Sequence, residues 1–136
     1  MKNQEHQWQA VTQWSDEAEN QLGDLLNGDK AGLIAEIEAT PQRAQLWKIS
    51  GPGYAGWLIT RIEELTSGEK ELFLIAARGN GYAAGIAQIK KIARDSGIKT
   101  VRAHSNRKGY ERYVRRFGMW LDEVLPGGEV VMRGMS

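Results

Sequence analysis

Hydrophobic and polar residues follow one another along the chain in patterns that predict several short strands and helices. Residues 45–50 and 54–63 carry Trp, Leu and Ile in short runs, and Gly51-Pro52-Gly53 lies between them, which is typical of two antiparallel strands joined by a turn. A further turn at 66–68 leads into residues 72–77, Leu-Phe-Leu-Ile-Ala-Ala. This run is apolar without alternation, so we expect a strand that is covered on both faces.

The residues before this meander predict one short edge strand and two helices. The edge strand falls within 6–14, where Trp and Val stand among polar neighbours. Helical spacing of apolar residues begins at Asp16 and is ended by Gly28, and a second helical pattern covers 30–39. Glu19 stands three residues after Asp16, which is the spacing of a capping box.

The residues after 72–77 predict a helix, a strand, another helix and a hairpin. An apolar stripe at helical spacing is ended by Gly97, and residues 98–103 read as the next strand. Strand, helix and strand in this order make a βαβ unit, whose crossover we expect to be right-handed. A fourth helix is predicted over 107–117, and a closing hairpin over 120–133.

Together these elements predict the α/β fold class, with a mixed, mostly antiparallel sheet, a central βαβ unit and helices on both faces. The length of 136 residues is sufficient for one core, so we expect a single domain over residues 1–136. Hydrophobic residues make up 41% of the chain and charged residues 26%, which is ordinary for a globular protein.

The composition excludes several kinds of chemistry. The chain has no cysteine, so it has neither disulfides nor a thiolate nucleophile. His6 and His104 are far apart in the sequence and have no partner at metal-ligand spacing, so we predict no metal site. No apolar run is long enough to span a membrane, and residues 1–6 do not resemble a signal peptide, so we expect a cytoplasmic protein without membrane contact.

The net charge of +1 is unevenly distributed. Residues 1–40 hold eight acidic and two basic side chains, whereas residues 99–116 hold seven basic side chains and one acidic. A solvated helix face explains the basic stretch. The alternative is a positive surface for an anionic cofactor, nucleic acid or an acidic partner.

Residues 72–84 carry the clearest chemical signal in the sequence. The apolar strand is followed by Gly79 and Gly81 and then by a helical pattern. A helix N-terminus presents unpaired N–H groups and a positive dipole end, and glycine lets a ligand approach the backbone, so this order suits a phosphate. The alternatives are an ordinary tight loop and a dinucleotide-binding turn; the latter lacks both a preceding βα unit and an acidic residue after the next strand.

The order of elements and one short motif resemble the GCN5-related N-acetyltransferase (GNAT) superfamily. The acyl-CoA loop of that family reads Gln/Arg-x-x-Gly-x-Gly/Ala, and residues 78–83, Arg-Gly-Asn-Gly-Tyr-Ala, match each fixed position. An apolar strand precedes the motif, and an amphipathic helix, a strand and a short helix follow it. The resemblance extends from about residue 6 to residue 133 and indicates a small member of the family, of a type that phages encode.

The resemblance implies that this stretch binds acetyl-CoA as a co-substrate, without a metal. Backbone N–H groups from Gly79 to Ala84 would hold the pyrophosphate, and the pantetheine arm would lie along the preceding strand. A backbone N–H near Ile75 would polarise the thioester carbonyl. The cofactor-binding residues so implied are Leu74, Ile75, Ala76, Ala77, Arg78, Gly79, Asn80, Gly81, Tyr82, Ala83, Ala84 and Asn106.

The same resemblance implies that Tyr113 is the catalytic acid that protonates the leaving thiolate of CoA. Asn106, Gly109 and Tyr113 have the spacing that many active members show. The family also places a glycine four residues after the tyrosine, and counting back four from Gly118 gives Val114, which has no proton to donate. A bulge in the helix would reconcile the two registers; otherwise Tyr113 is a core aromatic and the acid is absent.

The proton acceptor for the attacking amine is not identified by any motif. Glu63, Glu64, Glu69 and Glu71 lie near predicted strand ends and are candidates, although each also fits an exposed turn residue. His104 ends the strand before Asn106, so it is either a proton acceptor or a structural histidine.

Three functions follow from these observations. The first is an acyl-CoA-dependent N-acyltransferase in which an unknown amine, of a small molecule or a protein, attacks acetyl-CoA directly. The second is a catalytically inactive GNAT-fold protein with a structural or interaction role, such as a phage virion component that forms homo-oligomers or binds a virion partner. The third is a phage GNAT relative that modifies nucleic acid and uses the basic stretch to bind it.

Overall fold

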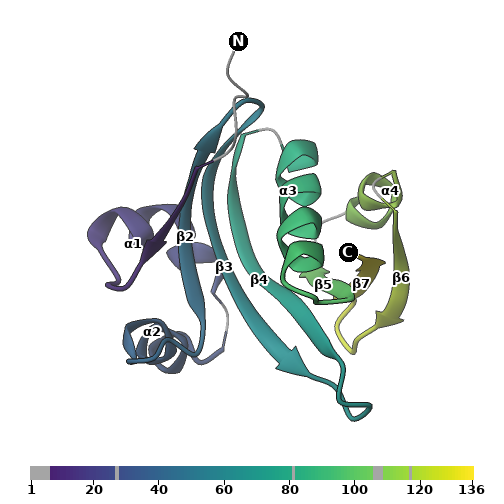
Figure 1. Ribbon diagram of the computed structural model, residues 1–136, viewed down its shortest axis with the longest axis horizontal. Coiled ribbons are helices and arrows are strands. Elements are labelled where there is room, and N and C mark those ends of the chain that lie inside the picture. Colours follow the sequence, from purple (N-terminus) through teal and green to yellow (C-terminus); the bar gives the residue numbers. More distant parts are fainter. Residues whose placement is uncertain (1–6, 27, 81, 106–108, 117) are drawn as a thin grey trace. The chain divides into compact units, whose positions relative to one another are not determined.

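The fold is described from a computed structural model of the chain (Figure 1). The structure describes residues 7–26, 28–80, 82–105, 109–116 and 118–136, and of residues 54, 82–85, 111 and 113 it describes the backbone alone. The elements are, in chain order, β1 (Gln7–Val11), α1 (Asp16–Leu22), the 3₁₀ turn η1 (Gly23–Leu25), α2 (Lys30–Glu38), β2 (Gln45–Gly51), β3 (Tyr54–Glu64), β4 (Lys70–Asn80), α3 (Tyr82–Asp95), β5 (Thr100–Ser105), α4 (Tyr110–Arg115), β6 (Met119–Val124) and β7 (Val130–Met135).

The strands form a seven-stranded sheet in the order β1-β2-β3-β4-β5-β7-β6. The pairs β1–β2, β2–β3, β5–β7 and β6–β7 are antiparallel, whereas β4 and β5 are parallel. Helix α3 connects these two parallel strands, as the predicted βαβ unit requires (Figure 1). The predicted fold class, a mixed and mostly antiparallel sheet with helices, is therefore confirmed.

The contacts within the chain gather into two compact units. The first unit consists of Met1–Arg61 and Ile75–Tyr82, and the second consists of Ile62–Leu74 and Ala83–Ser136. Strands β3 and β4 each contribute residues to both units. The prediction of a single domain over residues 1–136 stays a prediction.

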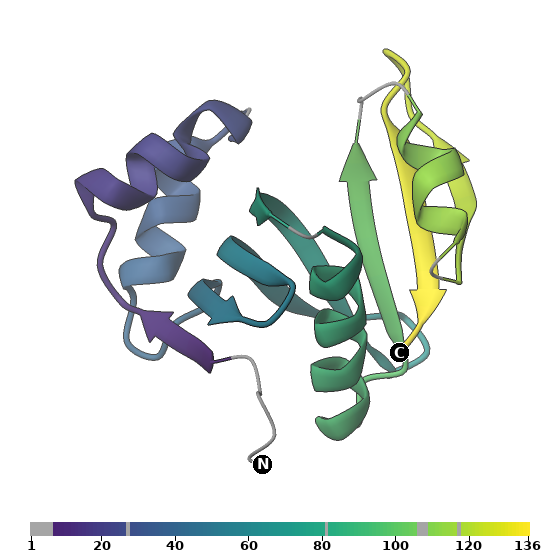
Figure 2. The same cartoon turned by 90° about the horizontal axis from the view of Figure 1, so that it is seen from above.

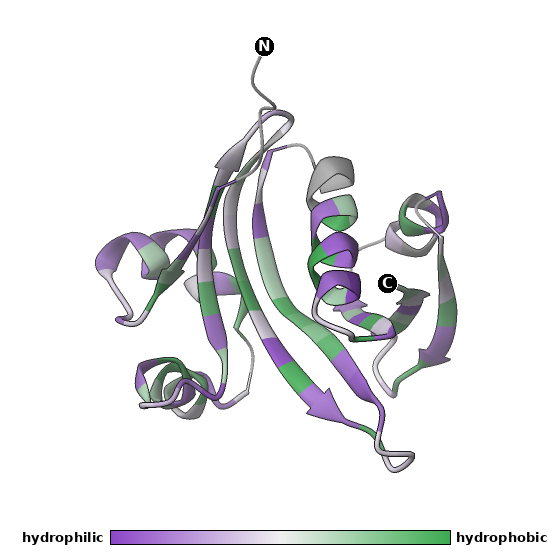
Figure 3. Ribbon diagram, viewed as in Figure 1, coloured by the Kyte–Doolittle hydropathy of each residue, from purple (hydrophilic) through white to green (hydrophobic). Residues whose placement is uncertain are grey.

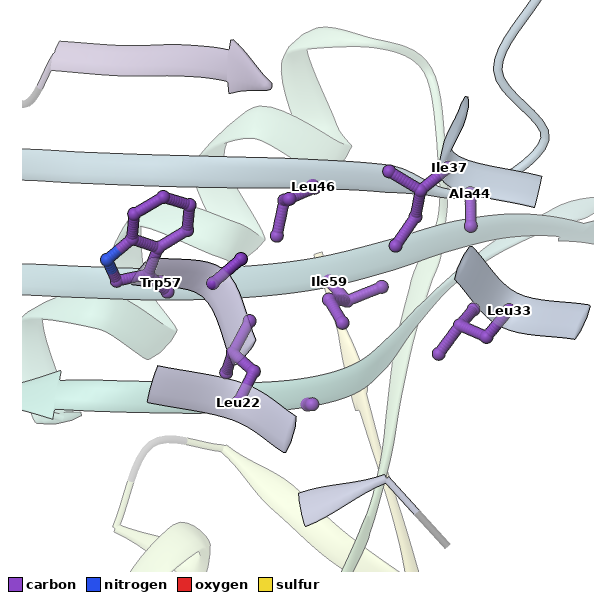
Figure 4. Close-up of a cluster of buried hydrophobic side chains, with 9 residues drawn as sticks. Leu22, Leu33, Ile37, Ala44, Leu46, Trp57 and Ile59 are labelled. Atoms are coloured by element: carbon purple, nitrogen blue, oxygen red, sulfur yellow. The ribbon is translucent and has the colours of Figure 1, made fainter. Parts of the chain in front are cut away.

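The first unit has an apolar core between its helices and strands (Figure 4). Leu22 and Ile37 of the two helices are fully buried, and Leu46 and Ile59 of the strands are fully buried with them. Figure 4 shows these side chains in one cluster with Leu33, Ala44 and Trp57.

The N-terminus of α1 differs from the sequence prediction. The N-cap is Ser15, whose hydroxyl oxygen accepts a hydrogen bond from the Ala18 N–H at 3.1 Å. The predicted capping box of Asp16 and Glu19 is therefore wrong, because Asp16 lies inside the helix and the Glu19 carboxylate instead accepts from Lys30 Nζ at 2.6 Å. Both residues are acidic and lie in the first turn, where they complement the helix dipole.

The second unit presents two different sheet faces. Residues that pair across strands share a face, so the register places Leu72, Val101 and Gly134 on one face together with Leu74, Ala103 and Met132. The opposite face carries Glu71, Phe73, Thr100, Arg102, His104 and Arg133. In Figure 3 the middle of β4 has the colour of apolar residues.

Two helices complete the second unit. Ile86, Ile89 and Ala93 of α3 are buried and form the predicted apolar stripe. Helix α4 packs against β6 and β7, and its Val114 is fully buried (Figures 1 and 2). The described helix, Tyr110–Arg115, is shorter than the predicted 107–117.

Candidate functional site

The stretch that the sequence marked for a phosphate is a strand followed almost at once by a helix. Strand β4 continues to Asn80, three residues beyond the predicted end at Ala77, and α3 begins at Tyr82. Gly81 stands between the two elements and lies outside the described residues, as does Asn106. The predicted order of strand, glycine and helix is present, with a shorter connection than the sequence suggested.

Gly79 belongs to β4, so its prediction as a loop residue is wrong. A Cβ added to Gly79 would lie 2.3 Å from the Ala55 carbonyl oxygen and 2.7 Å from the Gly56 Cα. A Cβ added to Gly56 would in turn lie 2.3 Å from the Arg78 carbonyl oxygen. Since real Cβ atoms do not approach backbone this closely, the two glycines are required where β3 and β4 come together, whatever else Gly79 does.

Arg78, the first fixed residue of the motif, is engaged in an ion pair. Its Nη2 atom lies 3.0 Å from Oδ2 of Asp24 in η1, and both side chains are exposed to solvent. An exposed pair of this kind contributes at most about 1 kcal/mol and is screened by salt. An anion near Arg78 would therefore compete with Asp24 at little energetic cost.

The parallel pairing of β4 and β5 is shorter than either strand. Four residue pairs join them, from Glu71 with Thr100 to Leu74 with Ala103. Strand β4 then continues through Ile75–Asn80, which the structure groups with the first unit. The side chain of Ala76 is buried in the core of that unit and Ile75 packs against it, so these residues can offer a ligand chiefly their backbone.

The first turn of α3 supplies the helix end that the motif requires. The helix has 14 residues and its first turn contains no acidic residue. Tyr82, Ala83 and Ala84 form this turn, and the structure describes their backbone alone. Free N–H groups at such a helix end attract an anion, and no carboxylate of the first turn opposes it.

Helix α4 contains the predicted catalytic acid. Tyr113 lies in the helix, but its side chain is outside the described part. All residues of Tyr110–Arg115 are α-helical, so the bulge that would reconcile the two registers does not lie among them. The neighbouring Val114, on which the alternative register falls, is a fully buried core residue.

Glu71 is the most deeply buried charged residue of the described chain, with none of its surface exposed. Its Oε1 accepts from Arg133 Nε at 2.5 Å and from Thr100 Oγ1 at 3.0 Å. Its Oε2 accepts from Arg133 Nη2 and from Arg102 Nη1, each at 3.1 Å. The prediction of an exposed turn residue is therefore wrong for Glu71, because two arginines satisfy its charge inside the unit.

These contacts also fix the protonation of Glu71. Burial alone would raise its pKa, but the hydrogen bonds from Arg133 and Thr100 and the charges of Arg133 and Arg102 hold that pKa below its ordinary value. A carboxylate with four donors and a lowered pKa is a poor proton acceptor. Glu71 is therefore a structural anion rather than a catalytic base.

The other three glutamate candidates lie in different surroundings. Glu63 accepts a hydrogen bond from Arg102 Nη2 at 2.6 Å and is partly buried. Glu69 lies in the turn before β4, 3.6 Å from Lys99 Nζ, and both side chains are largely exposed. Glu64 is exposed at the end of β3. The predicted turn-like exposure thus holds for Glu64 and Glu69 and is wrong for Glu63.

His104 has a partner that the sequence did not indicate. Its Nδ1 atom lies 2.9 Å from Oε1 of Glu129, which directly precedes β7. The imidazole also stacks on Phe73, with ring centroids 4.8 Å apart and the planes tilted by 44°. Glu129 is 25 residues away in the sequence, and only the register of β5 with β7 could have suggested the contact.

The basic stretch is less positive than its composition suggests. Arg102 is bound by Glu63 and Glu71, and Lys99 pairs with Glu69. Arg112 and Arg116 are exposed. A surface for nucleic acid on this stretch stays a prediction, with fewer cations to support it.

Metal clusters and membrane-spanning helices are both absent from the described residues. These residues contain no group of three or more His, Asp or Glu side chains placed to hold a metal ion. Among the same residues, no helix has the length and apolar character needed to cross a lipid bilayer.

Sheet order, the parallel β4–β5 pair and the crossover helix define a class of fold, and solved structures share it. A protein assigned as a GNAT-family acetyltransferase from Desulfovibrio desulfuricans aligns over 97% of this chain and 98% of its own, with a TM-score of 0.58 and 11% identity. A protein assigned as an acyl-CoA N-acyltransferase from Klebsiella pneumoniae aligns over 96% and 97%, with a TM-score of 0.57 and 14% identity.

A third structure, the PaiA N-acetyltransferase of Thermoplasma acidophilum in complex with coenzyme A, aligns over 79% of this chain and 71% of its own, with a TM-score of 0.50 and 15% identity. No protein-family model matches the sequence, and no curated protein does. At these identities the likeness shows the fold alone. The chain has the fold of these acetyltransferases, and the phage-type resemblance stays a prediction.

Proposed function

We propose that the protein is an acyl-CoA-dependent N-acyltransferase that transfers an acetyl group from acetyl-CoA to an amine. One observation carries the proposal: β4 pairs with β5 over only four residues, then continues to Asn80 and leads within two residues into α3. Backbone N–H and C=O groups beyond Leu74 and the free N–H groups of α3 thus follow one another along one continuous segment.

This segment fits the two polar parts of acetyl-CoA. The pantetheine arm carries amides that can bond to the backbone of Ile75–Ala77 as an added strand does. The pyrophosphate would meet the first turn of α3, where the dipole is positive and no acidic residue opposes it. Arg78 lies between the two and could leave Asp24 for the phosphate. The fold shared with acetyltransferases supports the same assignment.

The reaction that we propose is direct transfer. The amine nitrogen attacks the thioester carbonyl, the carbonyl oxygen becomes an oxyanion near the Ile75 N–H, and the carbon–sulfur bond then breaks. Tyr113 donates a proton to the thiolate, and the amine loses a proton to a base. The chain has no cysteine to form an acyl-enzyme, which is in keeping with a ternary complex.

Binding of acetyl-CoA, measured by calorimetry, tests this proposal first. We expect saturable binding to the native chain and at least about 100-fold weaker binding to Gly81→Glu, because the new carboxylate repels the phosphates. Ala35→Glu, which adds the same charge at an exposed position of α2, is the matched control and should bind normally. Failure of the native chain to bind acetyl-CoA would refute the proposal.

Release of CoA thiol in the presence of primary amines tests the reaction. We expect turnover with at least one amine of a panel that includes a polyamine, a lysine peptide and aminoglycosides. Tyr113→Phe should lower kcat by about 100-fold or more with little change in acetyl-CoA affinity, because only the proton donor is removed. Normal kcat in this variant would exclude Tyr113 as the acid.

A non-catalytic role is the second candidate, and the burial of Val114 favours it. Counting back four residues from Gly118 places the acid at Val114, which is a buried core residue without a proton to donate. Binding of acetyl-CoA without turnover of any amine would support this candidate. Steeply salt-dependent binding of DNA would instead support the third candidate, a protein that acts on nucleic acid.

A further inference from the structure

The pair His104–Glu129 has the geometry of an oriented proton acceptor. Nδ1 of His104 lies 2.9 Å from Oε1 of Glu129. An ionised carboxylate can only accept hydrogen bonds, so the proton of this contact belongs to Nδ1 of the neutral ring. The lone pair of the ring is then on Nε2. A carboxylate that fixes the tautomer in this way also stabilises the imidazolium that forms when Nε2 takes a proton.

The Nε2 atom is available to a second molecule. Among the described residues it has no hydrogen-bond partner, and the side chain of His104 is 27% exposed. The ring is held from the side by Phe73, at a centroid distance of 4.8 Å. Two contacts therefore hold the ring, and neither of them uses its Nε2 atom.

The position of His104 along β5 relates it to the proposed acyl-CoA segment. Ala103 pairs with Leu74 in the last pair of the β4–β5 ladder, and His104 is the next residue of β5. Leu74 is in turn the last residue of β4 before Ile75–Ala77, the segment proposed to bind the pantetheine arm. His104 therefore follows directly on the residue at which the β4–β5 ladder ends.

Two glutamates of the second unit, Glu71 and Glu63, are already committed to arginines. Glu71 receives four hydrogen bonds from Thr100, Arg102 and Arg133, and its pKa is lowered. Glu63 is bound to Arg102, whose guanidinium also lies 4.2 Å from the Phe73 ring centroid. His104 differs from these glutamates, because among the described residues no hydrogen bond occupies its Nε2 atom.

We propose that His104 is the catalytic base that removes a proton from the attacking amine, and that Glu129 is the residue that positions it. The inference rests on the acyltransferase function proposed above. As the carbon–nitrogen bond forms, Nε2 takes one proton from the amine nitrogen, and Glu129 balances the charge of the resulting imidazolium. The thiolate takes its proton from Tyr113, and solvent returns the proton of His104 to that tyrosine after the products leave.

Nuclear magnetic resonance of the imidazole nitrogens tests the geometry without any substrate. The chain has two histidines, so a His6→Gln variant assigns the signals of His104. We expect the Nδ1–H tautomer in the native chain at neutral pH and a mixture of tautomers in Glu129→Gln. A native chain with the proton on Nε2 would overturn the proposal.

Thiol release from acetyl-CoA with the best amine of the panel tests the role. We expect His104→Ala to lower kcat by about 100-fold or more, and added imidazole to restore a measurable part of the rate, because free imidazole can take the proton. His104→Gln should lower kcat similarly without rescue, and His6→Ala is the matched control with native activity. Acetyl-CoA affinity by calorimetry should be unchanged in every variant, which also shows that each one is folded.

The outcomes distinguish the assignment of His104 as the base from the proposed acyltransferase function on which it rests. Native kcat in both His104 variants with normal acetyl-CoA affinity would refute the base and leave the acyltransferase standing. A native chain that neither binds acetyl-CoA nor releases thiol with any amine would refute both. Glu129→Gln should lower kcat about tenfold with unchanged KM for the amine; a change in KM alone would assign Glu129 to binding instead.

Discussion

The two units hold their strands together by different means. The core of the first unit is apolar, with Leu22, Ile37, Leu46 and Ile59 fully buried, and no charged residue is among its described core residues. In the second unit, one sheet face is apolar and the other carries a fully buried carboxylate between two arginines. One sheet thus combines a core that depends on packing with a face that depends on a complete set of charges.

The difference predicts how each unit responds to a lost side chain. An apolar cluster loses stability gradually, because neighbours relax into the space that a shortened side chain leaves. A buried ionic cluster fails abruptly, because removal of one member leaves a desolvated charge without its partner. Glu71 connects β4, β5 and β7 through Thr100, Arg102 and Arg133, so its loss affects three strands at once.

The largest effect should come from Glu71→Ala. We expect the free energy of unfolding in urea to fall by about 3–5 kcal/mol, because Arg102 and Arg133 lose their shared counter-charge inside the unit. Glu64→Ala, which removes an exposed carboxylate from the end of β3, should change stability by less than about 0.5 kcal/mol. Equal effects of the two substitutions would show that the buried cluster contributes no more than a surface charge.

A smaller effect should follow from Leu46→Ala in the first unit. The side chain is fully buried in the apolar cluster, and its truncation should cost about 2–4 kcal/mol, since the transfer energy of three carbons and a cavity term are lost. Leu25→Ala in η1, where the leucine is 36% exposed, is the control and should cost much less. A cost for Leu46→Ala above that of Glu71→Ala would reverse the comparison between the units.

The smallest of the expected effects concerns the pH dependence of the free energy of unfolding, to which Glu71 of the second unit contributes. Because the pKa of Glu71 is lowered in the folded chain, the folded state binds its proton less readily than the unfolded state does. Its stabilising contribution is therefore present above the ordinary carboxyl pKa of 4.5 and is lost as the pH falls through the lower folded value. A decrease of one in the folded-state pKa corresponds to about 1.4 kcal/mol in the free energy of unfolding.

Urea unfolding between pH 7 and pH 2 measures this contribution. Glu71→Gln should show a shallower loss of stability on acidification than the native chain, because it has no carboxylate to protonate at this position. Glu64→Gln serves as the control, with the slope of the native chain. Identical slopes for all three proteins would mean that Glu71 does not titrate with folding.

Local patterns in the sequence were sufficient to predict the elements and the fold class. The period of apolar residues separates helices from strands, and the glycine and proline positions mark the turns. The βαβ unit followed from order alone, and the parallel pairing of β4 with β5 confirms it. Even the differences at this level are local, such as Ser15 replacing Asp16 as the cap of α1.

The candidate site was predicted only where it is continuous in sequence. Residues 72–84 were recognised because strand, glycine and helix follow one another, and the structure keeps that order. The role of Gly79 was missed, since its reason is the approach of Gly56 on another strand. A glycine in a motif does not reveal whether a ligand or a neighbouring backbone requires the space.

Tertiary structure alone decided which charges meet. Arg133 and Glu71 are 62 residues apart, and His104 and Glu129 are 25 apart, so no local pattern couples them. Their contacts depend on strand register, and a shift of one residue would turn each side chain to the other face. The sequence by itself determined the fold class and the order of strand, glycine and helix in residues 72–84, because both follow from the periodicity and order of neighbouring residues. The structure decided that Glu71 is buried between two arginines and that Glu129 contacts His104.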